Sequence, residues 1–254
     1  MRPFWIALQF LTRLPSPAVD YVDDDLIGRS ALFYPVVGAL IGVLLLTASC
    51  LLTLEPFHDF LSNAANVAAA LVLILWVSLT GALHLDGLGD SADAWLGGGR
   101  DKQRSLDIMK DPRAGTAAVV TIVLLLLVKF TALAQLFSHP TIWPILYAPV
   151  LGRSAALALL LTTPSTRSEG FAAQVTKNLP RRTAGSIIIG IGLLIVFVSP
   201  MMGSLLLLST VVISLLLRRL MLKRLDGTTG DTCGALVEII EATCLVSLCF
   251  FYNY

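Results

Sequence analysis

Apolar runs alternate with short polar segments along most of the chain, and most of the runs are long enough to cross a bilayer. A transmembrane α-helix needs about 20 consecutive, mostly apolar residues. Runs of this kind predict spans at 31–54, 64–83, 116–137, 142–161 and 235–251. A longer run, 187–217, is interrupted at Ser199-Pro200, where proline favours a turn, so we expect a hairpin of two short spans. The pattern predicts an all-α, polytopic integral membrane protein with about seven transmembrane helices.

Composition agrees with this fold class. Hydrophobic residues make up 56% of the 254 residues and charged residues 14%, and the mean hydropathy is +0.81. These values are typical of membrane proteins and not of soluble domains. The apolar run 3–11 is too short to span, so we expect an interfacial or partly inserted N-terminal helix. The whole chain, 1–254, is expected to form a single membrane-embedded catalytic domain.

The net charge and the positions of the cysteines argue against several classes of function. A net charge of +1 without a basic run argues against a nucleic-acid partner. The four cysteines show no CxxC spacing, which argues against disulfides and zinc. In the first predicted span, Gly38 and Gly42 form GxxxG, which fits either packing within the chain or a dimer face.

Basic residues in the predicted loops set the orientation. They occupy 2–29, 100–113, 167–182 and 218–224, whereas the loops at 55–63, 138–141 and 199–203 contain neither lysine nor arginine. Cytoplasmic loops of membrane proteins carry the excess of these residues. The distribution predicts a multi-pass protein whose polar loops, including 81–115 and 218–234, face the cytoplasm.

The densest polar block, 81–115, carries the first candidate site. Asp86, Asp90 and Asp93 are spaced i, i+4 and i+7, which puts three carboxylates on one helix face. Mg²⁺ prefers such oxygen ligands and commonly joins carboxylates to a substrate phosphate. His84 at the end of the apolar run and Gly87, which lets a ligand approach the backbone, complete the candidate set. The alternative is a solvated loop whose acids pair with its own bases.

A second acidic group lies near the C-terminal end. Gly230 and Asp231 precede the last apolar run, and Glu238 and Glu241 lie inside it. The turn 228–231, with glycine on both sides, is a candidate backbone nest for phosphate, so Gly230 is a candidate for substrate binding. Asp231 is a candidate fourth metal ligand, and the glutamates are candidates for ligands or a general base. The alternative is that the glutamates pair with Arg153 or Lys129, because charges inside a membrane need partners.

Basic residues provide candidate phosphate contacts. Arginine forks suit bidentate binding of phosphate oxygens, and lysine supplies a point charge. The candidates for substrate binding on this ground are Lys110, Arg113, Arg153 and Arg167.

The motifs, taken in order, resemble the cobalamin synthase family, the adenosylcobinamide-GDP ribazoletransferases. The resemblance extends over nearly the whole chain through FLTRLP at 10–15, FYPVVG at 33–38, HLDGLGDSAD at 84–93, IMKDPRAG at 108–115, Gly152-Arg153, and TGDTCGA at 229–235 with the two glutamates. One departure is Ala94, where the family usually has glycine and where we infer a turn.

The resemblance implies a reaction and its partners. A hydroxyl of α-ribazole, or of its 5′-phosphate, attacks the phosphate that joins cobinamide to GDP in adenosylcobinamide-GDP. GMP is expelled, and adenosylcobalamin or its 5′-phosphate forms, with Mg²⁺ as cofactor. The implied setting is the inner membrane of a bacterium. Homo-oligomers and association with other cobalamin-biosynthesis enzymes remain open.

Two other classes of membrane protein also use acidic residues of this kind and are alternative interpretations. CDP-alcohol phosphotransferases are membrane enzymes with an acidic DGxxAR motif, but here Asp90 replaces the alanine and no arginine follows. A cation-coupled transporter would use intramembrane charges as an ion path. Against transport, no repeat of the spans is evident and the acids gather toward one membrane face.

Overall fold

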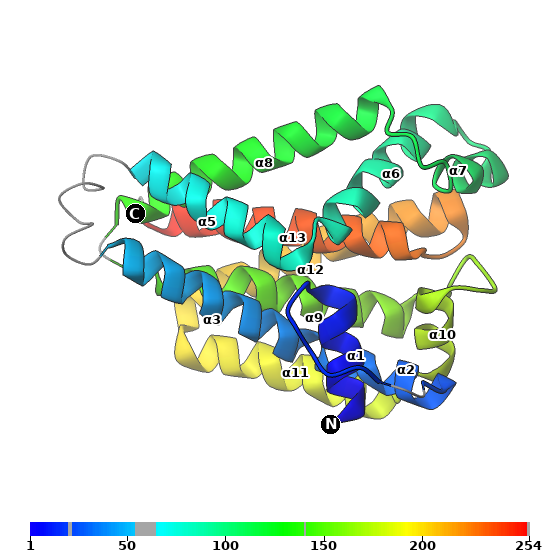
Figure 1. The fold of residues 1–254 in the computed structure, drawn as a ribbon, viewed down its shortest axis with the longest axis horizontal. Helices are drawn as coiled ribbons and strands as arrows, with labels where there is room; N and C mark the ends of the chain where they lie inside the picture. The colour runs from blue at the N-terminus through cyan, green and yellow to red at the C-terminus, as the bar shows by residue number, and fades with distance from the viewer. Residues whose placement is uncertain (20–21, 54–64, 140, 253–254) are drawn as a thin grey trace.

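The computed structural model describes residues 1–19, 22–53, 65–139 and 141–252, and this part of the chain is almost entirely helical (Figure 1). Its only β-contact is an isolated bridge between Ser165 and Thr228. The helices, in chain order, are α1 (Arg2–Leu11), α2 (Asp24–Ser30), the 3₁₀ turn η1 (Ala31–Phe33), α3 (Tyr34–Leu52), α5 (Ala65–Thr80), α6 (Leu83–Gly97), α7 (Lys102–Ile108), α8 (Thr116–Phe137), the 3₁₀ turn η2 (Trp143–Leu146), α9 (Tyr147–Thr162), α10 (Phe171–Asn178), α11 (Arg181–Val198), α12 (Pro200–Leu225) and α13 (Gly230–Tyr252).

The all-α membrane architecture predicted from the sequence is confirmed. Six helical segments of the described chain are long and apolar enough to cross a membrane, and the bent pair α5 and α6 makes a seventh if it crosses as one span. The predicted hairpin is also present, because α11 ends at Val198 and α12 begins with Pro200 in its first turn. Proline suits that position since the first helical N–H has no intrahelical partner. The predicted loop 55–63 lies outside the described residues.

A sharp bend separates α5 from α6. Gly81 and Ala82 both adopt left-handed backbone conformations, with φ of 60° and 59°, and the two helices meet at 86°. Such a conformation costs a non-glycine residue about 1–3 kcal/mol, so the surrounding packing must hold Ala82 in place. The bend ends the apolar helix at Thr80 and turns the aspartate block into a helix of its own.

Helix α13 lies between α6 and α9 and also packs against α8 and α12, as Figure 1 shows. Helix α3 packs closely on α9: a side chain at Gly38 would come within 2.5 Å of the Pro149 carbonyl oxygen, and one at Gly42 within 2.9 Å of that of Leu146. The GxxxG motif therefore serves packing within the chain, the first of the two alternatives.

The polar segments between helices gather at one end of the bundle. Helices α7 and α10 and the α12–α13 connection lie at this end, and the turn between α11 and α12 lies at the other (Figure 1). Two predicted boundaries were wrong. Helix α12 continues to Leu225, so the basic residues 218–224 belong to a helix and not to a loop, because arginine and lysine are good helix formers. The turn inferred at Ala94 is absent, since this alanine is buried inside α6.

Candidate functional site

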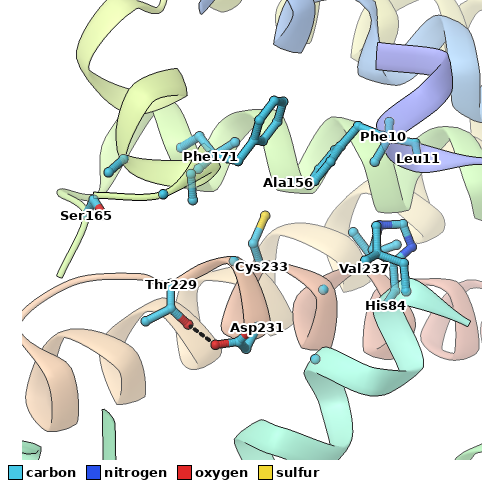
Figure 2. Close-up of a pocket in the computed structure, with 18 of the residues that line it drawn as sticks. Phe10, Leu11, His84, Ala156, Ser165, Phe171, Thr229, Asp231, Cys233 and Val237 are labelled. Carbon is cyan, nitrogen blue, oxygen red and sulfur yellow. Dashed lines mark hydrogen bonds between the residues drawn. The ribbon is translucent and has the colours of Figure 1, made fainter. Parts of the chain in front are cut away.

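A cavity of about 220 Å³ opens where α1, α6, α9, α10 and α13 meet the segment 163–170. Figure 2 shows side chains from these elements facing one another across it. Six of the residues proposed from the sequence lie on its wall: His84, Asp86, Gly87, Arg167, Gly230 and Asp231. The sequence motifs from the middle and the end of the chain therefore meet in one place.

The crossing of α6 and α13 brings the carboxylates together. A side chain at Gly87 would come within 2.7 Å of the Asp231 carbonyl oxygen, so only glycine permits this approach. Asp86, next to Gly87, is thereby placed on the same cavity wall as Asp231. The charges of Asp86, Asp93 and Asp231 all act on Asp90 one turn further along α6. Four carboxylates thus share one neighbourhood.

Arg167 is the one arginine on the described cavity wall, which contains no lysine. Its Nη2 lies 3.3 Å from Asp231 Oδ2 as an ion pair, with the side chains of Arg167 and Asp231 30% and 23% exposed. Partial exposure leaves both groups accessible to a ligand. The guanidinium group of an arginine in this position can bind two phosphate oxygens at once, as a bidentate contact.

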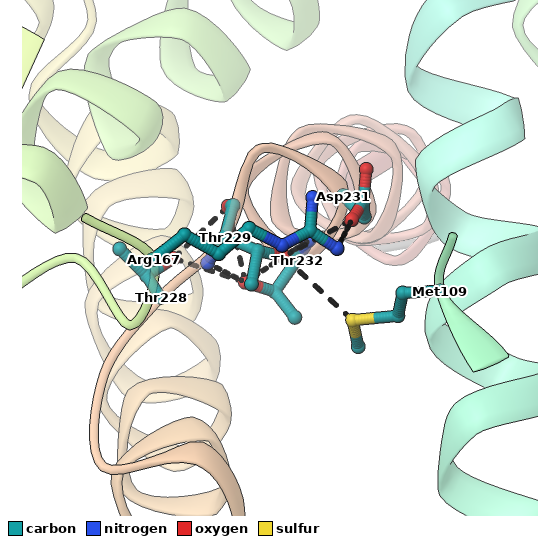
Figure 3. A network of polar contacts seen from close by, with 6 residues as sticks. All are labelled: Met109, Arg167, Thr228, Thr229, Asp231 and Thr232. Atoms are coloured by element: carbon teal, nitrogen blue, oxygen red, sulfur yellow. Dashed lines mark hydrogen bonds and ion pairs between the residues drawn. The ribbon is translucent and has the colours of Figure 1, made fainter. Parts of the chain in front are cut away.

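A threonine network fixes the backbone below this ion pair (Figure 3). The Thr229 N–H donates to Thr232 Oγ1 at 2.9 Å, and the Thr229 hydroxyl reaches Asp231 Oδ2 at 3.4 Å. The Thr228 N–H donates to the Pro164 carbonyl at 2.9 Å, which ties this turn to the segment carrying Arg167. Because the amides of Thr228 and Thr229 are engaged, they are not free to bind a phosphate.

Asp93 has a different environment from the other aspartates. Its Oδ2 accepts the Gly115 N–H at 2.6 Å, and its Oδ1 accepts the Ala118 N–H at 3.0 Å. Both oxygens thus satisfy N–H groups at the start of α8, which have no intrahelical acceptor. The structure places this predicted metal ligand at a helix start, off the cavity wall.

Lys110 and Arg113 also lie off the cavity wall. Both are exposed, and Arg113 Nη2 forms an ion pair with Asp111 Oδ2 at 2.7 Å. The hydrogen bonds from Arg113 lower the pKa of Asp111 to about 2, so the pair persists through the physiological pH range. Neither predicted substrate contact is brought to the cavity.

The two glutamates of α13 belong to a buried ion cluster. Lys129 Nζ lies 2.6 Å from Glu238 Oε2 and 2.5 Å from Glu241 Oε2, and Arg153 forms a second ion pair with Glu241. The structure thus shows the pairing that was the alternative to a catalytic role, with Lys129 binding both glutamates. The four side chains are almost fully buried, and none of them lies on the cavity wall.

The buried cluster connects five helices. Lys129 of α8 also lies 4.7 Å from the ring centre of Trp76 on α5. Arg153 of α9 places its Nη2 3.4 Å from His84 Nδ1 on α6. Because His84 also lies on the cavity wall, this contact links the cluster to the cavity and supports a positioning role for the His84 side chain.

Within the described residues, no group of three His, Cys, Asp or Glu side chains converges closely enough to hold a metal ion. The donor chemistry nevertheless fits Mg²⁺, because Asp86 and Asp231 on the cavity wall supply oxygen ligands. Asp90 lies off the wall, one turn along α6, and is subject to the charges of both. The cation of this group is Arg167, which pairs with Asp231. Unbalanced negative charge of this kind favours a bound cation.

Several cavity residues were not proposed as site residues from the sequence. Phe10 and Phe171 stack with ring centres 4.1 Å apart, and Tyr34, Ser165 and Thr229 also line the wall. Phe10, Tyr34 and Thr229 fall inside motifs that carried the family resemblance, so that signal could have found them. Phe171 follows a glycine-led turn and gave no signal.

These features define an all-α membrane protein with an acidic cavity that contains one arginine on its described wall. The model of the cobalamin-5-phosphate synthase family matches residues 3–249, and the chain belongs to this family. It is 52% identical over 250 residues to the adenosylcobinamide-GDP ribazoletransferase of Pseudomonas entomophila (strain L48), with 98% of both chains covered. It is 48% identical over 249 residues to the protein of the same name from Pseudomonas syringae pv. syringae (strain B728a), with 98% and 99% covered. No solved structure matches the chain.

Proposed function

We propose that this protein is an adenosylcobinamide-GDP ribazoletransferase. It joins α-ribazole, or its 5′-phosphate, to adenosylcobinamide-GDP with release of GMP. Adenosylcobalamin or its 5′-phosphate is the product. The family match over 3–249 favours this activity over a CDP-alcohol phosphotransferase or a cation-coupled transporter. The observation that carries the proposal at the atomic level is the meeting of Asp86, Asp231 and Arg167 on one cavity wall.

The reaction requires positioning and charge neutralisation more than covalent help. A hydroxyl oxygen of the ribazole forms a bond to the phosphorus attached to cobinamide. The bond from that phosphorus to the bridging oxygen breaks, and GMP leaves with the electron pair. Arg167 binds phosphate oxygens, and the proton of the attacking hydroxyl passes to a wall carboxylate, Asp86 or Asp231.

We infer that Mg²⁺ is the cofactor, held by Asp86, Asp90 and Asp231. When bound, it would neutralise charge on the phosphate oxygens. The support is the shared neighbourhood of these carboxylates, because Asp90 is subject to the charges of the other two. Asp93 is left out of this set because both of its oxygens hold the start of α8.

The test is GMP formation by the purified protein in liposomes, given adenosylcobinamide-GDP and α-ribazole. We expect GMP to appear in proportion to a cobalamin product, and to stop when EDTA removes Mg²⁺ and resume when Mg²⁺ is restored. α-Ribazole and its 5′-phosphate, supplied separately, would identify the preferred acceptor. Uptake of substrate into the liposomes without GMP would contradict the proposal, as would full activity in EDTA.

We further propose the inner membrane of a bacterium as the location, with the polar end of the bundle facing the cytoplasm. The support is that the basic segments 100–113, 167–182 and 218–224 lie at that end (Figure 1) and that cytoplasmic segments carry such residues. Single cysteines at Gln103 and Asn178, in a chain without its natural cysteines, would test it. An impermeant thiol reagent should label neither from outside intact cells, and labelling of either would contradict this orientation.

A further inference from the structure

A second cavity lies on another side of the molecule, in the groove between α9, α11 and α12, with α13 at its base. Its volume is about 240 Å³. The wall is almost wholly apolar, and none of its residues lines the first cavity, which holds Asp86 and Asp231. Its outer edge includes Val211 and Leu215, which are 51% and 49% exposed. In a membrane this edge would face acyl chains.

The groove has the length of one leaflet. On α12 its wall runs from Leu207 to Arg218, and a rise of 1.5 Å per residue makes this distance about 16 Å along the helix. The hydrocarbon core of a bilayer is about 30 Å thick, so the groove corresponds to about half of it. Arg218 closes the end that belongs to the basic, polar end of the bundle.

Two arginines bond to the end of α9 beside the groove, Arg218 from the groove wall and Arg181 from outside it. Arg218 donates from Nε to Thr163 Oγ1 at 3.0 Å and from Nη2 to the Thr162 carbonyl at 2.8 Å. Arg181 donates from Nη2 to the neighbouring Leu161 carbonyl at 2.5 Å. Both guanidinium groups are therefore held beside the last turn of α9. A guanidinium carries five N–H donors, so each retains donors for an anion.

Ser214 supplies a second polar feature inside the groove. Its hydroxyl is buried and has no hydrogen-bond partner in the described part of the chain, although the residue lines the cavity. It lies one helical turn from Arg218, about 6 Å deeper in the groove. In a glycerolipid, ester carbonyls lie just below the phosphate and can accept a hydrogen bond from such a hydroxyl.

We propose that this groove is a binding site for one anionic phospholipid. Its phosphate contacts Arg218 and Arg181, an ester carbonyl accepts from Ser214, and one acyl chain fills the apolar groove. The positive charge at the headgroup end favours an anionic lipid over a zwitterionic one. A volume of about 240 Å³ is far smaller than that of a helix segment about 16 Å long and about 10–12 Å across, so the groove does not enclose a helix of a second copy.

Native mass spectrometry of the detergent-purified protein, titrated separately with phosphatidylglycerol and phosphatidylcholine, tests the proposal. We expect one phosphatidylglycerol to remain bound at concentrations where phosphatidylcholine is lost. Arg218→Gln should weaken phosphatidylglycerol binding about tenfold, because a charge-assisted contact is removed. The matched control is Arg219→Gln, since Arg219 is exposed and does not line the groove.

A second pair of variants tests the groove without touching a charge. Gly192 lines the cavity, and a Cβ there would meet only Leu207 Cδ1, at 3.7 Å, so Gly192→Leu should fold and fill the groove. Gly190→Leu is its control, because a Cβ at Gly190 meets nothing within 4 Å and Gly190 does not line the cavity. Lipid binding should be lost in the first variant and kept in the second.

Three results would overturn the proposal. One is phosphatidylglycerol binding within about twofold of the parent in both Arg218→Gln and Gly192→Leu. Another is displacement of the bound lipid by an equal concentration of glycerol phosphate, because an acyl chain would then contribute nothing. The third is a mass spectrum in which Gly192→Leu abolishes binding of a second protein copy, and not of a lipid, while Gly190→Leu retains that copy.

Discussion

Two acidic regions of this protein contain the same kinds of side chain but have different roles. In the buried cluster, Glu238 and Glu241 are matched by Lys129 and Arg153, so negative and positive charges balance. On the described wall of the first cavity, Asp86, Asp231 and Glu169 lie with one arginine and no lysine. Balanced charges inside a bundle hold helices together, whereas a surplus of carboxylates at an accessible wall leaves room for a metal ion and a phosphate.

The difference also explains where each region lies. The buried cluster connects α5, α6, α8, α9 and α13, and its members are nearly inaccessible. The cavity wall combines residues of α1, α6, α9, α10 and α13 with the segment 163–170, and its polar groups include exposed ones. His84 belongs to both regions, through its contact with Arg153 and its place on the wall. The cluster thereby fixes the position from which α6 presents Asp86.

The largest expected effect comes from unbalancing the buried cluster. Lys129→Met leaves two buried glutamates with one cation, and breaking a buried pair in this way costs about 3–5 kcal/mol. We expect a loss of folded, monodisperse protein and a much lower unfolding temperature. The control is Lys102→Met, which removes an exposed ion pair with Asp226 and should cost under about 1 kcal/mol. Equal unfolding temperatures for the two variants would contradict the account.

Neutralising a wall carboxylate should affect rate and not folding. Asp86→Asn removes one proposed metal ligand from an exposed position, so we expect GMP release per folded molecule to fall at least about 100-fold. The Mg²⁺ concentration needed for half-maximal rate should rise. Asp107→Asn is the control, because Asp107 is exposed and its carboxylate accepts from the exposed Gln103 away from the cavity wall. A rate for Asp86→Asn close to that of Asp107→Asn would exclude a ligand role for Asp86.

A smaller effect distinguishes the cavity arginine from the exposed one. Arg167→Lys keeps the charge but loses the fork, so the rate should fall about tenfold or more. Arg113→Lys should stay within about twofold of the parent, because Arg113 is paired with Asp111 away from the wall. The measurement is GMP release at saturating and limiting substrate. The reverse ranking would restore Arg113 as the phosphate contact.

The smallest expected effect concerns Asp93. An asparagine keeps one acceptor for the α8 amides and loses the other, which should cost about 0.5–2 kcal/mol of stability. The rate per folded molecule should stay near that of the parent. Thermal unfolding followed alongside GMP release would separate the two quantities. A rate as low as that of Asp86→Asn, with unchanged stability, would return Asp93 to the metal site.

The sequence was sufficient for the fold class and for part of the site. Helical spacing correctly placed Asp86, Asp90 and Asp93 in one helix, and the hairpin at Ser199-Pro200 followed from proline. The role of Asp93 could not be predicted, because it depends on the segment after α7 folding back so that α8 starts beside it. The length of the apolar run also gave too short a length for α12, because the basic residues that follow the run continue the helix.

The sequence could not show which residues distant in the chain contact one another, and this limited the prediction of the site most. The sequence named Lys129 and Arg153 as alternatives for pairing with the glutamates, and only the packing of α8 and α9 on α13 shows that both take part. Phe171 reaches Phe10 because α10 and α1 both pack on α2, which no local pattern encodes. Local periodicity predicts a helix face but not what that face meets.

The central claim is that carboxylates on the cavity wall carry the chemistry and those in the buried cluster carry the structure. The most direct test compares Asp231→Asn with Glu238→Gln, measuring GMP release per correctly folded molecule in liposomes across pH. We predict a loss of at least about 100-fold for Asp231→Asn with normal folded yield. Glu238→Gln should lower the yield and keep the parent rate and pH profile per folded molecule. A normal rate for Asp231→Asn, or a lost rate with normal yield for Glu238→Gln, would contradict the claim.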